Sequence, residues 1–204
     1  MLGALHHAAV FRRRVRVLSG WIAPLIPPGA HVLDVGSGDG DVAQQVMASR
    51  SDVHVRGIDV LVRPSTHIPV EAFDGARIPA ADRSIDAVLL IDVLHHTHDP
   101  AALLREAARV ARHAVIVKDH CADGAFAKLT LRAMDWVGNA RYGVALPYNY
   151  WPEWRWRREL ERMGLRIDAW HGKLDLYPPP LSLLFDRRLH FVARFVRAGA
   201  ARAA

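Results

Sequence analysis

The chain has 204 residues, which is about the length of one domain, so we expect a single domain spanning residues 1–204. With 51% hydrophobic and 24% charged residues, its composition is that of a globular protein and excludes a largely disordered chain. The formal net charge of +6 comes mainly from arginine and could favour nucleic acid, anionic lipid or acidic substrates. A solvated, arginine-rich surface would give the same charge.

Cysteine and histidine usage limits the chemistry. The single cysteine, Cys121, excludes an intramolecular disulfide and a cysteine-based metal cage. The 12 histidines show no HExxH or comparable ligand spacing, so we expect no metal. The sequence shows no secretory signal, and its longest apolar run, Ala87–Ile91, is too short to span a bilayer. We therefore expect a cytoplasmic protein.

The first expected element is an amphipathic helix over about residues 5–26. Val10, Val17 and Trp21 recur at helical spacing, and prolines from Pro24 onward end the pattern. Four arginines lie between residues 12 and 16, so this helix could make peripheral contact with an anionic membrane. The alternative is a helix that covers a sheet edge or the mouth of a cofactor site.

Strand and helix patterns alternate through the middle of the chain. The expected strands cover residues 31–35, 53–58, 70–73, 85–91 and 114–117, with helices after Gly40 and after Asp99-Pro100. The nearly continuous apolar run Ile85–Ile91 is typical of a central parallel strand covered on both faces. This alternation predicts an α/β fold with a Rossmann-like, doubly wound, mostly parallel sheet. Such sheets bind ligands beyond the carboxyl ends of their strands.

The last third of the chain departs from this alternation. Residues 121–150 are rich in aromatic residues and glycine, which suggests a cap-like insertion over the ligand edge of the sheet. A helix is expected over residues 152–163. The alternating segments 165–171 and 189–195 predict a C-terminal antiparallel strand pair.

The motif that carries most information is VLDVGSGDGD, residues 32–41. A strand ends at Val35 and runs into three glycines, which permit positive φ and close approach of a ligand to the backbone. The spacing is G-x-G-x-G and not the G-x-G-x-x-G of dinucleotide sites. Asp34, Asp39 and Asp41 would repel a pyrophosphate but suit a cofactor that carries a sulfonium and an ammonium group. The local charge therefore favours S-adenosylmethionine over NAD.

Asp59 lies at the end of the second expected strand, about 20 residues past the glycines, where a carboxylate can accept both ribose hydroxyls. This residue does not separate the two cofactors, because both contain a ribose. Alone, it could equally be a helix cap or a solvated turn residue.

The chain resembles the class I S-adenosylmethionine-dependent methyltransferases, in particular the small methyltransferase type 11 group. The resemblance covers about residues 30–118 and rests on VLDVGSGDG, GIDV, FDGARIP, DRSIDAVLLIDVLHHTHDP and LLREAARV. The aromatic segment after Cys121 is not part of the shared core and leaves the acceptor undetermined.

The resemblance also implies roles for individual residues. The methionine part of the cofactor would be lined by Asp34, Gly36, Ser37 and Gly38, and the ribose would be bound by Asp59. The adenine would be met by Asp74 with Gly75. The cofactor's amino group would be approached by the backbone of Asp92 and Val93.

The acceptor site is less defined. His95, His96 and His98 follow the fourth expected strand, and imidazole suits proton transfer near neutral pH. We take His95 or His96 as the candidate base, the alternative being a helix-entry or cofactor-wall residue. A pocket for an aromatic, quinone-like or lipid-like small molecule could be walled by the aromatic and amide residues Trp136, Asn139, Tyr142, Tyr148, Asn149, Tyr150 and Trp151, which could equally form a core beneath the insertion.

Two other functions remain open. One is a nucleotide-cofactor oxidoreductase. The other is a non-catalytic cofactor-binding or membrane-associated accessory protein, suggested by the arginines at 12–16 and 155–158. Nucleic acid is not an expected partner, because the segment Asp92–His95 lacks the Asn/Asp-Pro-Pro-aromatic pattern that amino-methylating enzymes share. The sequence leaves the oligomeric state open.

Overall fold

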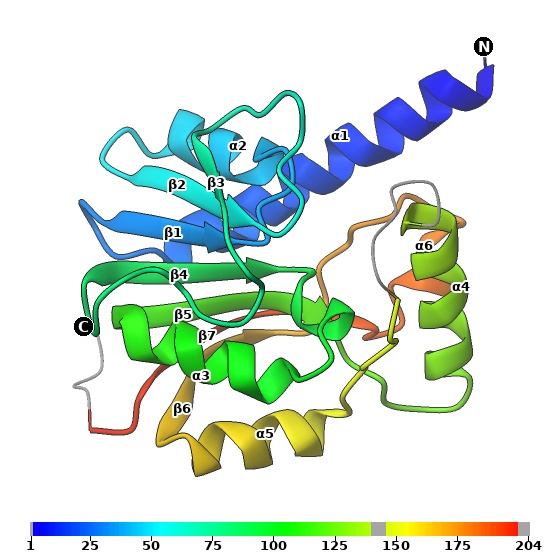
Figure 1. Cartoon of the computed structure of the whole chain (residues 1–204). Coiled ribbons are helices and arrows are strands. Elements are labelled where there is room, and N and C mark those ends of the chain that lie inside the picture. The colour runs from blue at the N-terminus through cyan, green and yellow to red at the C-terminus, as the bar shows by residue number, and fades with distance from the viewer. Residues whose placement is uncertain (1, 140–145, 200–204) are drawn as a thin grey trace.

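The computed structural model describes residues 2–139 and 146–199 and is built on one sheet (Figure 1). Its seven strands are arranged in the order β3-β2-β1-β4-β5-β7-β6. The strands are β1 (His31–Val35), β2 (His54–Asp59), β3 (Val70–Ala72), β4 (Ile85–Ile91), β5 (Ala111–His120), β6 (Leu165–His171) and β7 (His190–Arg197).

The strand directions confirm the predicted sheet. Strands β1 to β5 run parallel to their neighbours, whereas β7 pairs antiparallel with both β5 and β6. The carboxyl ends of the five parallel strands therefore lie along one edge. Because β7 runs the other way, its first residue, His190, lies opposite His120 at that same edge.

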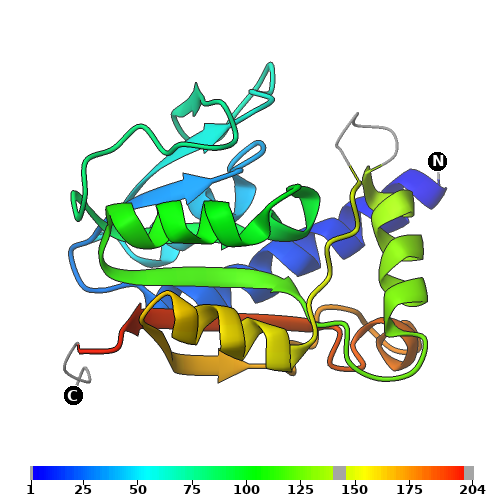
Figure 2. The same ribbon diagram turned by 60° about the horizontal axis from the view of Figure 1, so that its bottom comes forward.

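The helices cover both faces of the sheet, as a doubly wound fold requires (Figure 2). The helices of the described residues are α1 (Leu2–Ile22), η1 (Ala23–Leu25), α2 (Asp41–Ser49), η2 (Leu94–His96), α3 (Pro100–Val110), α4 (Ala127–Asn139), α5 (Glu153–Arg162) and α6 (Ser182–Phe185), and four of them cover the sheet. Helices α1 and α2 pack on one face through residues such as Ile22 and Val46. Helices α3 and α5 pack on the other through Leu104 and Trp156.

Alternation along the strands explains this division. In β4, Val88 and Leu90 face α3, whereas Ala87 and Leu89 face α1 and α2. All four side chains are fully buried, because successive residues of a strand point to opposite faces and both faces are covered. The nearly continuous apolar run in the sequence follows from this arrangement.

Some element boundaries differ from the expected ones. Helix α1 begins at Leu2 and ends at Ile22, earlier at both ends than the expected 5–26. It ends early because Pro24 lies in the first turn of the short helix η1 that follows. Helix α5 begins and ends one residue inside the expected range of 152–163. Asp99 caps α3 as expected, accepting a hydrogen bond from the Ala102 N–H at 3.0 Å.

The most consequential difference is in β5, which extends to His120, three residues beyond the expected end at Val117. The three additional residues are Lys118, Asp119 and His120. Because they are polar, the sequence predicted that the buried strand ends before them. All three are nevertheless buried in the structure. They bring charged groups to the ligand edge of the sheet.

The segment expected to form a cap contains α4, which lies with α6 beyond the carboxyl ends of the strands (Figure 1). Ala127 and Leu131 of α4 form a small apolar cluster with Tyr150 and Leu189. Residues 140–145 of the expected insertion lie outside the described residues. Within the described parts, no helix combines the length and the apolar character needed to cross a bilayer.

Candidate functional site

The glycine-rich turn after β1 contains three glycines in the left-handed region, Gly36, Gly38 and Gly40, with φ of 72°, 61° and 82°. Two of them are required by packing. A Cβ on Gly36 would lie 2.5 Å from Val93 Cγ2, and one on Gly40 would lie 2.5 Å from Ile68 Cγ1. Gly38 differs, because a Cβ there would meet no heavy atom within 4 Å. Gly38 therefore faces open space, where a ligand can approach the backbone.

Asp59 holds this turn against the tip of β2. Its Oδ2 accepts a hydrogen bond from the Gly38 N–H at 2.8 Å, and its Oδ1 accepts one from the Leu61 N–H at 2.8 Å. The Gly36 N–H also donates to the Ile58 carbonyl at 2.7 Å. Each carboxylate oxygen can still accept a further bond. Asp59 is thus positioned beside the open glycine, as its predicted role at a ribose requires.

Asp34 and Ser37 place unsatisfied polar atoms beneath the same turn. Asp34 is 2% exposed, and neither its Oδ1 nor Ser37 Oγ has a hydrogen-bond partner. Burial, and to a smaller extent the neighbouring Asp59 carboxylate, raises the pKa of Asp34 to about 7. A buried carboxyl oxygen without a hydrogen-bond partner is costly, and a cationic ligand would relieve that cost. The residues of this turn therefore fit a cofactor with a sulfonium and an ammonium group.

Asp74 and Gly75 follow β3, next to the tip of β2. Asp74 is exposed, and its Oδ1 accepts hydrogen bonds from the N–H groups of Ala76 and Arg77, both at 2.8 Å. Gly75 has φ of 80°, and a Cβ there would lie 2.9 Å from Val60 Cγ1. The loop after β3 thus packs against the loop after β2, but a contact of Asp74 with adenine stays a prediction.

Asp92 has a role that the sequence did not indicate. It follows β4 with φ of 57°, and its carboxylate forms ion pairs with Lys118 and Arg14. Burial alone would raise the pKa of Asp92, but Lys118 and Arg14, with smaller effects from His120 and His95, hold it well below its usual value. Its side chain therefore joins β4, β5 and α1. The expected backbone contact of Asp92 and Val93 with the cofactor stays a prediction.

The candidate base His95 is enclosed by acidic residues. Its Nδ1 lies 2.7 Å from Asp119 Oδ1, and its Nε2 lies 3.5 Å from Asp135 Oδ2. Asp119 also accepts a hydrogen bond from the Leu94 N–H at 3.1 Å, which fixes η2 on β5. Burial alone would lower the pKa of His95, but Asp119, with Asp135 and Asp92, raises it above its ordinary value.

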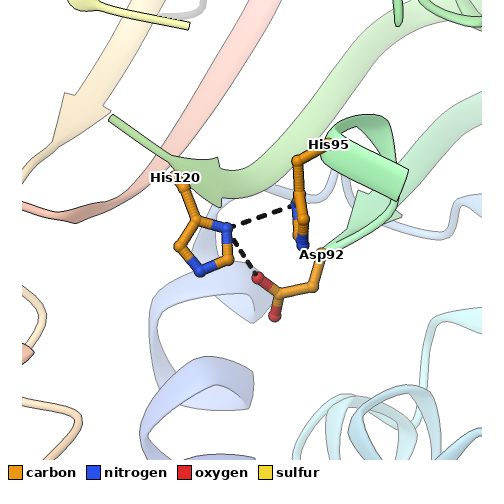
Figure 3. A group of neighbouring side chains, drawn as sticks. All are labelled: Asp92, His95 and His120. Carbon is orange, nitrogen blue, oxygen red and sulfur yellow. Dashed lines mark hydrogen bonds and ion pairs between the residues drawn. The ribbon is translucent and has the colours of Figure 1, made fainter. Parts of the chain in front are cut away.

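His96 lies beside this buried histidine but is less enclosed. The ring centroids of His95 and His96 are 4.0 Å apart, and only His95 is buried, with 2% of its surface exposed. On the other side, His120 Nδ1 lies 3.2 Å from His95 Nδ1 and 3.8 Å from Asp92 Oδ1 (Figure 3). Burial, with His95 and Lys118 nearby, lowers the pKa of His120 to about 4, so this ring is neutral near pH 7.

Two groups among the described residues have the spacing of metal ligands: Asp92 with His95 and His120, and His95 with His96 and Asp135. In the first group, Asp92 is already paired with Lys118 and Arg14. In the second, Asp135 accepts a hydrogen bond from the Tyr150 hydroxyl. The carboxylates of both groups thus have protein partners already and do not need a metal ion to compensate them. The expected absence of a metal stays a prediction.

Sequence reasoning missed most of this polar cluster. One signal for the cluster was present in the sequence: a polar run directly follows the buried strand pattern at residues 114–117. This run is Lys118, Asp119 and His120. Asp135 and His190 carried no such signal, because they reach the cluster from distant parts of the chain through tertiary packing.

The aromatic residues expected to wall a pocket divide between core and surface. Trp151 is 2% exposed and contacts Trp156 in the core, whereas Trp136 is 63% exposed. Trp151 therefore belongs to the core, which is the alternative that the sequence left open, and a pocket role for the exposed Trp136 stays a prediction. Tyr142 and the side chain of Asn139 lie outside the described part of the chain.

Comparison with known proteins now decides the family. The family model described as a methyltransferase domain matches residues 6–169, most of the chain. The chain belongs to this methyltransferase family. The match confirms the expected resemblance to class I methyltransferases, whose cofactor is S-adenosylmethionine.

Two curated relatives resemble parts of the methyltransferase. One is 27-O-demethylrifamycin SV methyltransferase of Amycolatopsis mediterranei (strain S699), which is 30% identical over 53% of this chain and 47% of its own length. The other is an O-methyltransferase of Pyrenophora dematioidea, which is 34% identical over 42% of this chain and 36% of its own length. The chain thus spans about half or less of the curated relatives that it matches.

Solved structures support the Rossmann-like fold. An S-adenosylmethionine-dependent methyltransferase from Mesorhizobium loti is 17% identical with a TM-score of 0.64, over 88% of this chain and 98% of that one. Magnesium protoporphyrin IX methyltransferase from Synechocystis PCC 6803, solved with bound S-adenosylhomocysteine, is 18% identical with a TM-score of 0.60, over 93% of this chain and 84% of that one.

The glycine turn allows a direct test of the methyltransferase's cofactor contact. We expect Gly38→Ala to weaken S-adenosylhomocysteine binding more than tenfold, measured by calorimetry, because the new methyl group occupies the open space beside the turn. Gly29→Ala is the matched control. Gly29 also has a positive φ, 65°, and a Cβ there would likewise meet no heavy atom within 4 Å, but this residue lies before β1, at the opposite end of the strand. Both variants should lose about 1–2 kcal/mol of stability from backbone strain. Wild-type affinity in Gly38→Ala would contradict the assignment.

The raised pKa of Asp34 predicts a proton linked to cofactor binding. A cation bound nearby favours the ionised carboxylate, so binding near pH 7 should release about half a proton. Affinity should therefore rise about tenfold between about pH 6 and pH 8, because the free site must lose this proton at low pH. Calorimetry in buffers of different ionisation enthalpy measures the release. Asp34→Asn should abolish it and Asp52→Asn should retain it; equal release in wild type and Asp34→Asn would count against the mechanism.

Proposed function

We propose that the chain transfers the methyl group of S-adenosylmethionine to an oxygen of a small-molecule acceptor of aromatic, quinone-like or lipid-like character. The observation that carries the proposal is the glycine turn, where the open Gly38, the buried Asp34 with its unpartnered Oδ1 and the Asp59 carboxylate converge. The choice of oxygen is supported by the names of the two curated relatives, both of which specify an O-linked methyl group.

Within this proposal, Asp34, Ser37 and the backbone at Gly36 and Gly38 hold the methionine part of the cofactor, and Asp59 holds the ribose. When bound, S-adenosylmethionine supplies an electrophilic methyl group on a positively charged sulfur. The task of the chain is then to align an acceptor lone pair with that methyl group, an arrangement worth roughly 7–11 kcal/mol of the barrier. The contact between Gly36 and Val93 fixes the turn relative to the loop after β4.

We further propose that His96 accepts the acceptor's proton and that His95 is a positioning residue. The buried Nε2 of His95 has no hydrogen-bond partner and cannot be reached by an acceptor without rearrangement. Its other nitrogen is tied to Asp119, so the ring is held in one orientation. His96 is more accessible and lies against this fixed ring, because both belong to η2. The ion pair between Asp119 and His95 would thus set the position of the base.

The two alternative functions fit the structure less well. In an oxidoreductase the cofactor diphosphate would lie at the N-terminus of α2, but Asp41 occupies the first turn of that helix and Asp39 lies beside it. A non-catalytic accessory protein would not need a buried histidine held by a carboxylate at the ligand edge. A cytoplasmic location is also part of our proposal, and its support is that Cys121 is free and buried.

Removing the proposed base should separate catalysis from cofactor binding. We expect His96→Gln to lower the rate of methyl transfer by about 10²–10⁴-fold, because a neutral amide cannot take up the acceptor's proton. The affinity for S-adenosylhomocysteine should not change. The measurement is incorporation of labelled methyl groups into a panel of phenols, hydroquinones and hydroxylated lipids.

His98→Gln is the matched control, because His98 lies in the same loop but is exposed. It should keep the wild-type rate. An unchanged rate in His96→Gln would exclude His96 as the base. Cofactor binding by the wild-type chain without transfer to any acceptor in the panel would instead favour the accessory function.

A further inference from the structure

Helix α4 exposes an unusually apolar outer face. Phe126, just before the helix, and Leu129, Trp136 and Val137 within it are 74%, 67%, 63% and 60% exposed. At about 100° per residue, the three side chains within the helix, Leu129, Trp136 and Val137, fall within an arc of roughly 100° on one side of it. They form a continuous stripe and are not scattered surface residues, which would need no explanation.

The opposite side of α4 is fixed in the protein, so the outward direction of the stripe is determined. Ala127, Leu131 and Asp135 on that side are buried. Asp135 accepts a hydrogen bond from the Tyr150 hydroxyl and lies 3.5 Å from His95 Nε2. Rotating the helix to bury the stripe would break these contacts and expose Asp135.

The short helix α6 extends the same surface. Leu183 and Leu184 are 74% and 56% exposed, and Arg187, just after α6, donates a hydrogen bond to Thr130 Oγ1 on α4 at 3.0 Å. Figure 1 shows α4 and α6 together at one end of the molecule. We call the exposed apolar residues of this region the α4–α6 face: Phe126, Leu129, Trp136, Val137, Leu183 and Leu184.

The border of this face is basic. Lys128 and Arg132 on α4, and Arg187 and Arg188 after α6, are all exposed. The only acidic residue of α4 is the buried Asp135. Apolar side chains with tryptophan, bordered by lysine and arginine, are typical of helices that lie in the interface of an anionic membrane. Every exposed charged side chain of α4, and each of those at positions 187 and 188, is a cation, which complements an anionic surface and agrees with the net charge of +6.

We propose that the α4–α6 face docks onto an anionic lipid bilayer. The apolar side chains enter the boundary between headgroups and acyl chains, and the four cations contact lipid phosphates. This places the membrane contact on α4 and α6 and not on the arginines at 12–16. If the proposed methyl transfer is correct, an apolar acceptor leaving the bilayer would reach His96, beside the buried His95, across about one helix diameter, roughly 10–12 Å.

Vesicle co-sedimentation tests the docking surface with the full-length chain. We expect binding to vesicles of phosphatidylcholine mixed with phosphatidylglycerol and little binding to phosphatidylcholine alone. The double variant Leu129→Ser/Trp136→Ser should reduce the partition coefficient at least about tenfold, because it removes apolar area that enters the membrane. The double variant Lys128→Gln/Arg132→Gln should reduce the partition coefficient about fivefold for each cation lost. Added salt should make this loss relative to the wild type smaller, because it screens the charges.

Trp154→Ser is the matched control, because Trp154 is 61% exposed but lies on α5. It should bind vesicles as the wild type does. The proposal is overturned if the wild type does not bind anionic vesicles or if the double variant binds as tightly as the wild type. It is also overturned if the double variant instead converts a dimer to a monomer in analytical ultracentrifugation, since a second copy would then cover the face.

S-adenosylhomocysteine binding by the same variants separates this inference from the proposed function. We expect wild-type affinity in all of them, which also shows that they are folded. Loss of vesicle binding with intact cofactor binding supports the docking surface whatever the acceptor is. Absence of cofactor binding in the wild type would contradict the methyl-transfer proposal and leave the vesicle result to be judged independently.

Discussion

The hydrogen bond from the Gly38 N–H to Asp59 Oδ2 joins the two strand tips on which the proposed cofactor site depends. At Gly36 and Gly40 the turn has no room for a side chain, because a Cβ would lie 2.5 Å from Val93 and from Ile68. Asp59 supplies one contact that holds the turn in place and Val93 the other, through its approach to Gly36. Together they fix the turn between β1, β2 and the loop after β4. The open position beside Gly38 and the buried Asp34 carboxyl follow from this arrangement.

Charge burial imposes a second constraint at the same edge. Placing Lys118, Asp119 and His120 in a covered strand would be costly if they had no partners. Asp92 compensates Lys118, and His95 compensates Asp119. These pairs connect β5 with the loop after β4. The ion pairs that compensate the buried charges therefore also orient η2 and its two histidines. The fold and the proposed acceptor site therefore depend on one network.

Local patterns were sufficient to predict most of the fold. The apolar run of β4, the Asp99-Pro100 helix start and the alternation of β6 each reflect neighbours in sequence, and the structure confirms them. The left-handed glycine turn was predictable for the same reason, because its glycines are close together in the sequence, whereas its role as the cofactor site stays a prediction. The family match confirms the cofactor class that their charge indicated.

What sequence reasoning missed depends on contacts between distant segments. The end of β5 was placed too early because polar residues are normally exposed. Lys118 and His120 can be buried only because residues of other elements pair with them, and the sequence does not show those partners. Asp135 could not be linked to His95 because they are far apart in sequence and meet through the packing of α4. The outward direction of the α4–α6 face has the same origin, since a helical stripe in a sequence does not reveal which side meets the protein.

Calorimetric titration with S-adenosylhomocysteine, comparing the wild type with Asp59→Asn, tests the central claim most directly. We predict saturable binding of one equivalent by the wild type, no binding of NADH, and an affinity about 10–100-fold weaker in the variant, since a hydrogen bond to a charged acceptor contributes about 1.5–3 kcal/mol. Equal affinities in the two proteins, or preference for NADH, would contradict the assignment of this turn as the S-adenosylmethionine site.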